Sequence, residues 1–371
     1  MYKLSIDVYN EKNIKYVEEE EEEIIENYID IPHNEMFIKL YDNNKNKLNV
    51  ILVCRPFEKD EDYKIFLTNK HDHIFLGISS FQEFPKQPLN KHEGWKTNIK
   101  PNGDIYYEEM YKTMFDGWLH CFKNPKEYFD TSKPHALISE SDFVNYESKV
   151  PDKGINEREY DYVYVCTRTD WNMKNPGEDT CYDWTSINKN WPLAKKCLPI
   201  LSGPKNKGGF NLKGLLVGRQ GCDLPEDTQQ NLTTTLHMDY SQLMKSFSNA
   251  KFIFIPNVHD ASPRIITEAM CFDTRVLINR NIAGGWKYAD PTVPESKPPA
   301  GELFSDENDL SNSLKKLLDN MNNYKPRKQI IDNYGPVNSG KRLKKFLMDN
   351  YKDKLKFEKD FEYIMYPRWK P

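Results

Sequence analysis

The sequence has few of the features that identify a protein's chemistry directly. It contains no apolar run long enough to cross a bilayer, and its start, MYKLSIDVYNEKN, lacks the apolar core of a secretory signal. Its 52 basic and 56 acidic residues give a net charge of −4, so no basic excess favours nucleic acid as a partner. We therefore expect a cytoplasmic protein without a transmembrane segment and without nucleic acid as a partner.

Cysteine is scarce and scattered. The seven cysteines are odd in number and form no Cys-x-x-Cys pair, and Cys54, Cys166 and Cys271 lie in apolar surroundings. We interpret them as reduced core thiols, the state typical of an intracellular protein, rather than as disulfides or zinc ligands. No histidine, cysteine or carboxylate cluster has metal-ligand spacing, so no metal is expected. Neither common glycine-rich phosphate motif is present, so phosphate would be bound by helix N-termini and basic side chains.

One low-complexity run is present, six consecutive glutamates at 18–23. We interpret it as a solvated helix face or loop. Heavy use of Lys, Asn and Asp suggests an AT-rich genome, such as that of a virus or a small eukaryote. A viral protein of this kind would act in the cytoplasm of its host.

Short apolar runs alternate with polar segments of helix length. Such runs, rich in Val, Ile and Phe, are typical of strands buried on both faces of a parallel sheet, and the alternation predicts a doubly wound α/β fold. The expected strands lie at 50–54, 74–78, 136–138, 162–166, 215–217, 252–255 and 276–278. The expected helices lie at 184–196, 240–248, 263–272 and 309–321.

The length of 371 residues suggests two domains. The polar segment 148–159, which contains a proline and a glycine, separates two α/β halves. The first domain is therefore expected at 1–152 and the second at 153–340. The remaining residues, 341–371, have the pattern of a charged amphipathic helix followed by an aromatic tail.

The segment 251–288 carries the strongest indication of a ligand site. Its first apolar run leads to Ser262-Pro263-Arg264, which is typical of a helix start because a serine can cap and a proline suits the first helical position. A helix N-terminus favours an anion. Arg264 and Glu268 share one face and could hold a phosphate and a ribose diol. The alternative is a surface helix with an Arg264–Glu268 ion pair.

The same segment resembles the donor-binding core of GT-B glycosyltransferases, especially those of family 4. Asp260, seven residues and Glu268 occupy the places of that family's two acids, and Glu268-Ala-Met-Cys-Phe-Asp-Thr-Arg-Val is similar to its Glu-Ala-Met-Ala-x-Gly-x-Pro-Val. The resemblance implies that Glu268 accepts hydrogen bonds from ribose hydroxyls and that Asp260 faces the donor sugar. Two departures are the shorter acid at Asp260 and Asp273 in place of glycine, although aspartate tolerates a left-handed turn.

The resemblance extends over most of the second half of the chain. It implies that Arg168 and Lys174 grip the donor diphosphate, although these two could instead be ordinary loop charges. Arg219 is a competing candidate for the same role. His237 and Met238 match the base-contacting loop by position, unless they belong to an ordinary loop.

Gly284 and Gly285 follow the strand at 276–278. They would let backbone approach a ligand, or form a plain turn.

The first domain is implied to bind the acceptor. Ser79, Ser80 and Glu83 follow an expected strand and could meet sugar hydroxyls. His120 matches a histidine that related retaining enzymes carry at the cleft, with a structural histidine as the alternative. The acceptor candidates after the next strand are Glu140 and Asp142, which could equally cap a loop.

Taken together, the resemblance implies a GT-B enzyme with two Rossmann-like domains facing across a cleft. It would move a hexosyl or pentosyl group from a nucleotide sugar, UDP-sugar favoured and GDP-sugar second, to a glycan or other hydroxyl acceptor, with retention and without a metal. The tail at 341–371 would pack back on the first domain. The alternatives are a GT-B epimerase, hydrolase or phosphorylase, and a sugar-binding module without turnover.

Overall fold

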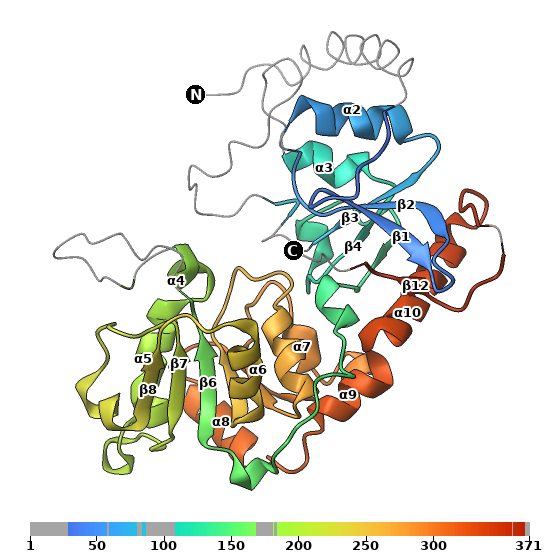
Figure 1. Ribbon diagram of the computed structural model, residues 1–371. Coiled ribbons are helices and arrows are strands. Elements are labelled where there is room, and N and C mark those ends of the chain that lie inside the picture. The colour runs from blue at the N-terminus through green and yellow to red at the C-terminus, as the bar shows by residue number, and fades with distance from the viewer. Residues whose placement is uncertain are drawn as a thin grey trace, which may run out of the picture.

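The computed structural model describes residues 29–57, 59–79, 84–86, 108–167, 181, 184–357 and 359–367. The glutamate run at 18–23 lies outside these ranges. Two six-stranded sheets form separate domains, and helices α9 (Pro326–Asn333) and α10 (Gly335–Tyr351) run along one side from the second domain to the first (Figure 1).

The first sheet has the order β12-β1-β2-β3-β4-β5. Strands β2 to β5 are parallel, whereas β1 is antiparallel to both of its neighbours. The bounds are β1 Phe37–Asp42, β2 Lys47–Val53, β3 Ile74–Ile78, β4 Gly117–Leu119, β5 His135–Ala136 and β12 Ile364–Met365. Helices α2 (Asp60–Asn69) and α3 (Glu108–Met114) pack on one face of this sheet.

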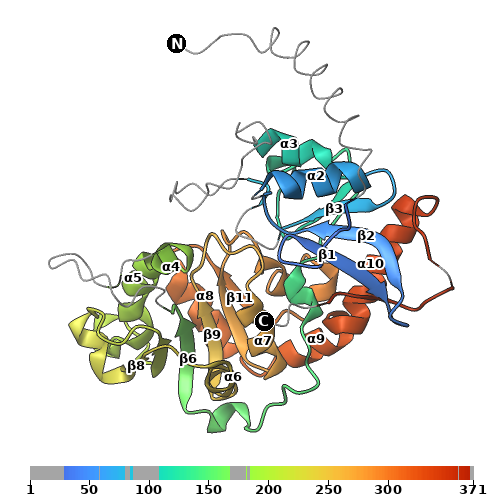
Figure 2. The ribbon, with the colours of Figure 1, turned by 45° about the horizontal axis from the view of Figure 1, so that its top comes forward.

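The C-terminal segment completes this first domain. Strand β12 pairs with β1, and Leu343, Phe346 and Leu347 of α10 are buried against the other face of the first sheet. Residues from both ends of the chain therefore share one core, as the blue and red elements show in Figure 2.

The second sheet has the order β11-β10-β9-β6-β7-β8 and is parallel throughout. The strand bounds are β6 Tyr160–Val165, β7 Gly214–Val217, β8 Leu232–Thr235, β9 Ala250–Ile255, β10 Arg275–Asn279 and β11 Gly301–Phe304. Helices α6 (Tyr240–Ser248) and α7 (Arg264–Cys271) cover one face. Helices α4 (Trp184–Asn188), α5 (Trp191–Ser202) and α8 (Leu310–Asp319) lie on the other side.

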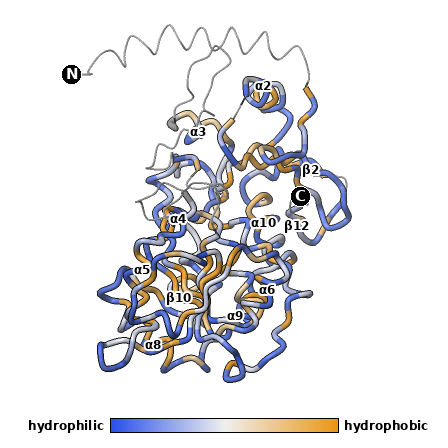
Figure 3. The backbone as a smooth tube through the Cα atoms, turned by 60° about the vertical axis from the view of Figure 1, so that its left-hand side comes forward, coloured by the Kyte–Doolittle hydropathy of each residue, from blue (hydrophilic) through white to orange (hydrophobic). Residues whose placement is uncertain are grey.

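Burial on both faces explains the continuous apolar runs. In β9, Ile253 and Ile255 join the core beneath α6 and α7, whereas Phe252 and Phe254 join the core beneath α5 and α8. Figure 3 shows the apolar stretch around β10 inside this domain. The predicted doubly wound α/β fold is confirmed.

Two predicted elements differ in extent. The strand expected at 136–138 is only β5, because the chain turns into a short 3-10 helix, η3 (Glu140–Phe143). The helix expected at 184–196 is broken after α4. There Asn190 takes a left-handed conformation, φ 52°, and its side chain accepts a hydrogen bond from Leu193 N, so that a second helix, α5, begins in a new direction.

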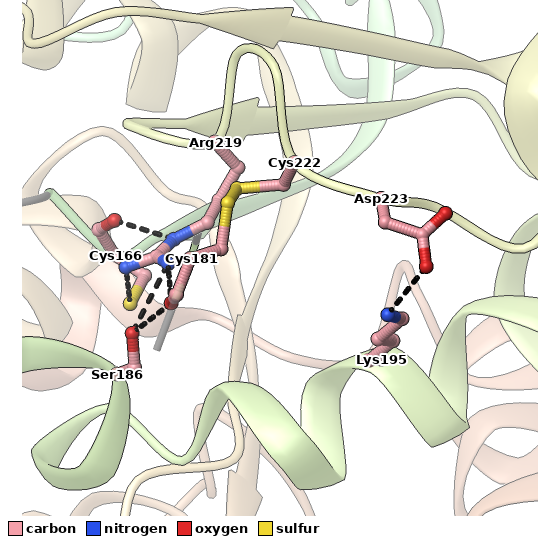
Figure 4. Close-up of a disulfide and its surroundings, with 7 residues drawn as sticks. All are labelled: Cys166, Cys181, Ser186, Lys195, Arg219, Cys222 and Asp223. Carbon is pink, nitrogen blue, oxygen red and sulfur yellow. Dashed lines mark hydrogen bonds and ion pairs between the residues drawn. A yellow bond between two sulfur atoms is a disulfide. The ribbon is translucent and has the colours of Figure 1, made fainter. Parts of the chain in front are cut away.

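The prediction that the cysteines are reduced is wrong for two of them. Cys181 and Cys222 form a disulfide, with their Cα atoms 5.6 Å apart, whereas the other five are buried thiols (Figure 4). The two residues are 41 positions apart. Cys181 lies beyond β6 and Cys222 beyond β7, and because these parallel strands are neighbours their exits share one edge.

Along the part of the chain that the structure describes, no helix is long and apolar enough to cross a membrane.

Candidate functional site

A cavity of about 660 Å³ lies between the two domains. It is at the carboxyl ends of the second sheet, where parallel α/β domains bind ligands. The first domain lines it with Glu35, Ile38, Cys54, Arg55 and Glu140. The second lines it with Lys189, Tyr240, Leu243, Asp260, Ser262, Pro263, Arg264, Ile265 and Glu268. The cavity therefore contains both charge signs on opposing walls.

The loop after β9 places Asp260 in this cavity. Its carboxylate accepts a hydrogen bond of 3.0 Å from Asn257 Nδ2 and forms an ion pair with Lys189 Nζ. Its backbone oxygen accepts from Gly284 N at 2.9 Å. Both side chains of the ion pair are largely buried, at 13% exposure for Asp260 and 22% for Lys189. The acid is thus held firmly, and its charge is matched by one cation.

Helix α7 carries Glu268, whose side chain is buried. Its Oε1 accepts a hydrogen bond from Tyr240 OH at 3.2 Å. Arg264, one turn earlier, is exposed at the mouth of the helix and also lines the cavity. A buried carboxylate next to an exposed cation can bind a ligand that carries both hydroxyls and negative charge.

Ser262 does not cap α7 as predicted. Its Oγ instead accepts a hydrogen bond of 3.0 Å from Ser141 N, which belongs to the first domain. Pro263 lies at the N-cap, one position earlier than expected, and it provides no side-chain cap. The contact between domains competes with the local cap for the same hydroxyl.

The two glycines after β10 allow two backbone segments of the second domain to pack closely. A Cβ at Gly284 would lie 1.7 Å from the carbonyl oxygen of Ala261. Gly285 has φ 89°, and a Cβ there would meet Ile266 and Pro263. Their missing side chains thus let this loop rest against the segment that leads into α7.

Lys189 was missed by the sequence analysis. It follows α4 directly, its amide donates to Thr185 O at 2.8 Å, and its carbonyl accepts from Tyr164 OH at 3.1 Å. The next residue, Asn190, donates from Nδ2 to Pro256 O at 3.0 Å. An asparagine before Trp-Pro is a recognisable helix start, so the corner could have been found from the sequence.

Of the other residues that were predicted to bind the donor, those that the structure describes are not found in the cavity that contains Glu268. Arg168 and Lys174 lie outside the described residues. Arg219 is fully buried, and its guanidinium donates to protein acceptors away from the cavity, so its predicted role as a phosphate contact is corrected. His237 and Met238 line a separate cavity of about 390 Å³ beside α6. The structure does not bring them into the cavity of Glu268.

The first domain places Ser79 and His120 on neighbouring strand ends. Strands β3 and β4 are paired up to Ile78 and Leu119, and Ser79 N donates to Leu119 O at 3.0 Å. Among the described residues, Ser79 Oγ and His120 Nδ1 are buried without a hydrogen-bond partner. Burial, with the charges of His135 and Lys287, lowers the pKa of His120 to about 3. The ring is therefore neutral at physiological pH.

Of the remaining residues that were predicted to contact the acceptor, one lines the cavity and one is buried. Glu140 lines the cavity, whereas Ser80 and Glu83 lie outside the described residues. Asp142 is fully buried and accepts hydrogen bonds from Lys287 Nζ at 2.8 Å and Tyr288 OH at 2.7 Å. Burial opposes its ionisation, yet the charges of Lys287 and Arg342 hold its pKa below the ordinary value. The prediction that Asp142 contacts the acceptor is therefore corrected. Its side chain has a structural role between the two domains.

The two facing Rossmann-like domains define the GT-B fold. The sequence matches no protein-family model and no curated protein. Among solved structures, the lipopolysaccharide outer core galactosyltransferase WaaB superposes with a TM-score of 0.52 and 11% identity, over 91% of this chain and 80% of WaaB.

Two further matches are more distant. Staphylococcus aureus TarM, in complex with UDP, gives a TM-score of 0.47 and 15% identity over 76% of this chain. This chain spans only 52% of the length of that TarM chain. The sucrose-phosphate synthase of Thermosynechococcus elongatus gives 0.48 and 12%, over 81% of this chain and 74% of that one.

Proposed function

We propose that this chain is a glycosyltransferase that moves a sugar from a nucleoside-diphosphate sugar to a hydroxyl of a glycan or another acceptor. The observation that carries the proposal is the cavity between the two domains, in which Glu268 and the Lys189–Asp260 pair of the second domain face the first. The GT-B fold, and the resemblance of the segment from Asp260 to Val276 to family-4 enzymes, support the same conclusion.

The donor nucleotide is assigned to the second domain. The Glu268 carboxylate would accept hydrogen bonds from the two ribose hydroxyls beside the hydroxyl of Tyr240. Lys189 and the N-terminus of α7 would bind the diphosphate, because a cation and free amide groups stabilise anions at such a place. UDP is the first nucleotide to test, since the resembled family commonly uses UDP-sugars, and GDP is the second.

The transfer would need no protein nucleophile. The bond between the anomeric carbon and the diphosphate oxygen breaks, the acceptor oxygen bonds to the same carbon from the same face, and the acceptor's proton passes to the leaving diphosphate. Lys189 would stabilise the charge that develops on the diphosphate. Asp260 would face the donor sugar. Ser79 and His120 stay candidates in the first domain, buried behind the residues that line the cavity. The result is retention of configuration.

The test is thermal unfolding of the protein with UDP, GDP, ADP and CMP, followed by the sugar conjugates of the nucleotide that binds. A ligand that binds only the folded state stabilises it by about 2.7 kcal/mol at a hundred times its dissociation constant. We expect Glu268→Gln to lose this stabilisation and Glu147→Gln, an exposed acid outside the cavity, to keep it.

The outcomes separate the alternatives. Release of sugar to water without an acceptor would indicate a hydrolase, and nucleotide binding without turnover would indicate a binding module. If no nucleotide at millimolar concentration shifts the wild-type midpoint, the proposal is wrong.

A further inference from the structure

Arg219 occupies the interior of the second domain at the exit of β7. Its Nε donates to Cys166 O at 2.8 Å, and its NH1 group donates to Cys181 O at 2.8 Å and to Ser186 Oγ at 3.2 Å (Figure 4). The guanidinium also lies 5.2 Å from the ring centre of Trp191, the first residue of α5. One buried side chain therefore joins the exits of two strands to the start of two helices.

The disulfide makes a second connection between the same segments. It links Cys181, which is fully buried, to Cys222, which is half-buried and is the more exposed of the two. The residue after Cys222 forms an exposed ion pair of 3.1 Å with Lys195 of α5. Such a surface pair contributes little by itself, so Arg219 and the disulfide are the stronger of these three connections.

Arg219 and the disulfide are both connected to Lys189 through helix α4. Ser186, which Arg219 contacts, lies in α4, and Ser186 Oγ also donates to Cys181 O. Thr185, its neighbour, accepts the amide hydrogen of Lys189. Helix α4 has only five residues and cannot hold its own position, so its contacts with the β7 exit fix where Lys189 enters the cavity.

We propose that Arg219 and the Cys181–Cys222 disulfide form a redox-sensitive brace that positions Lys189 for the diphosphate of the donor. The proposal rests on the proposed function above. A reducing dithiol would attack the sulfur of Cys222, the more exposed of the two cysteines, releasing the Cys181 thiol. The second thiol of the reductant then closes its own disulfide, so that two electrons and two protons pass to the two cysteines. Arg219 would remain to hold the β7 exit to α4.

This arrangement would give the disulfide a role wherever thiol reductants are present. Disulfides of intracellular proteins are usually transient or redox-sensing rather than structural. This bond has one partly exposed cysteine, and its other cysteine is connected through α4 to Lys189, so it is suited to such control. The oxidised protein would bind the nucleotide diphosphate more tightly than the reduced one.

The experiment compares UDP binding by oxidised and dithiothreitol-reduced wild-type protein, with thiols counted after denaturation. The expected counts are five for the oxidised protein and seven for the reduced one. We expect reduction to weaken UDP binding roughly five- to tenfold, less than the loss of a whole charged hydrogen bond. Cys222→Ser should bind as the reduced protein does and should not respond to dithiothreitol.

Arg219 is tested as a positioning residue by Arg219→Lys and by hydrogen exchange. Arg219→Lys keeps the charge but loses the fork of donors, so we expect weaker UDP binding together with faster amide exchange in 184–190. The same exchange should rise in wild-type protein on reduction. Amide exchange is measured without a ligand, so it tests whether Arg219 and the disulfide hold residues 184–190 even if UDP does not bind.

Three outcomes would overturn the brace. The first is seven thiols in protein prepared without reductant, and the second is equal exchange at 184–190 in both redox states. The third is unchanged UDP affinity on verified reduction. If exchange rises but no nucleotide binds either form, the brace holds, and the proposed function, with the role assigned to Lys189, is wrong.

Discussion

His120 lies at the end of β4 with its ring buried, and its Nε2 is 3.3 Å from His135 Nδ1. Burial disfavours the charged ring, and the nearby charges of His135 and Lys287 act in the same direction. At the scale of single residues, the end of β4 therefore holds a buried, neutral histidine that can accept or donate one hydrogen bond. Such a ring can orient a sugar hydroxyl without adding charge.

This histidine should make stability fall in mild acid. Its pKa is lowered from 6.5 to about 3 in the folded protein, so the unfolded chain takes up a proton first as pH falls below 6.5. Between about pH 7 and pH 5 this uptake should cost about 2 kcal/mol of unfolding free energy. His120→Asn should show a correspondingly shallower pH dependence in denaturant unfolding. The exposed His71→Asn is the control, and equal slopes for both variants would contradict the prediction.

At the scale of elements, the corner between α4 and α5 decides how Lys189 reaches the cavity. Asn190 stands in the left-handed region and uses its side chain for both Leu193 N and Pro256 O. A single continuous helix would carry Lys189 elsewhere. The break between the two helices is therefore the local feature that places Lys189 in the cavity.

Substitution of Asn190 should separate backbone strain from capping. Asn190→Ala loses the cap and replaces a residue that tolerates the left-handed region with one that does not, which should cost about 1.5–3 kcal/mol. Asn190→Gly loses the side-chain contacts but adopts this conformation readily, so it should be less destabilised. Thermal unfolding of the two variants measures the difference. The explanation fails if alanine is tolerated as well as glycine.

At the scale of the whole molecule, a buried cluster joins the two domains. Asp142 comes from η3, Lys287 and Tyr288 from the segment after β10, and Arg342 from α10. The indole of Trp286 adds a hydrogen bond of 2.8 Å to Cys121 O of the first domain. These contacts hold together the two domains that line the cavity.

Breaking this cluster should be costly. Asp142→Asn leaves Lys287 buried without its counter-charge, and we expect a loss of about 3–5 kcal/mol in unfolding free energy. The double variant Asp142→Leu with Lys287→Met should recover part of that loss. Asp332→Asn removes an exposed ion pair and should change stability by less than about 0.5 kcal/mol. A double variant no better than Asp142→Asn would show that charge is not the cause.

Much of the fold could be predicted because its signals are local in the chain. The apolar runs of β9 and β10 are recognisable within a few residues, since strands buried on both faces need no polar alternation. The Asp260-x7-Glu268 spacing is equally local, and the structure brings both acids to one cavity. The misassigned capping of Ser262 shows the limit, because its hydroxyl is used by the other domain.

Contacts between distant segments could not be predicted in the same way. Lys189 and Asp260 are 71 residues apart, Asp142 and Lys287 are 145 apart, and Cys181 and Cys222 are 41 apart. Each pair meets because strand order and the approach of the two domains bring their backbones together. Local patterns thus established the strands, the helices and one pair of acids. Which cation faces those acids, and which cysteines are joined, depended on tertiary packing, because no spacing along the chain encodes which loops share a sheet edge.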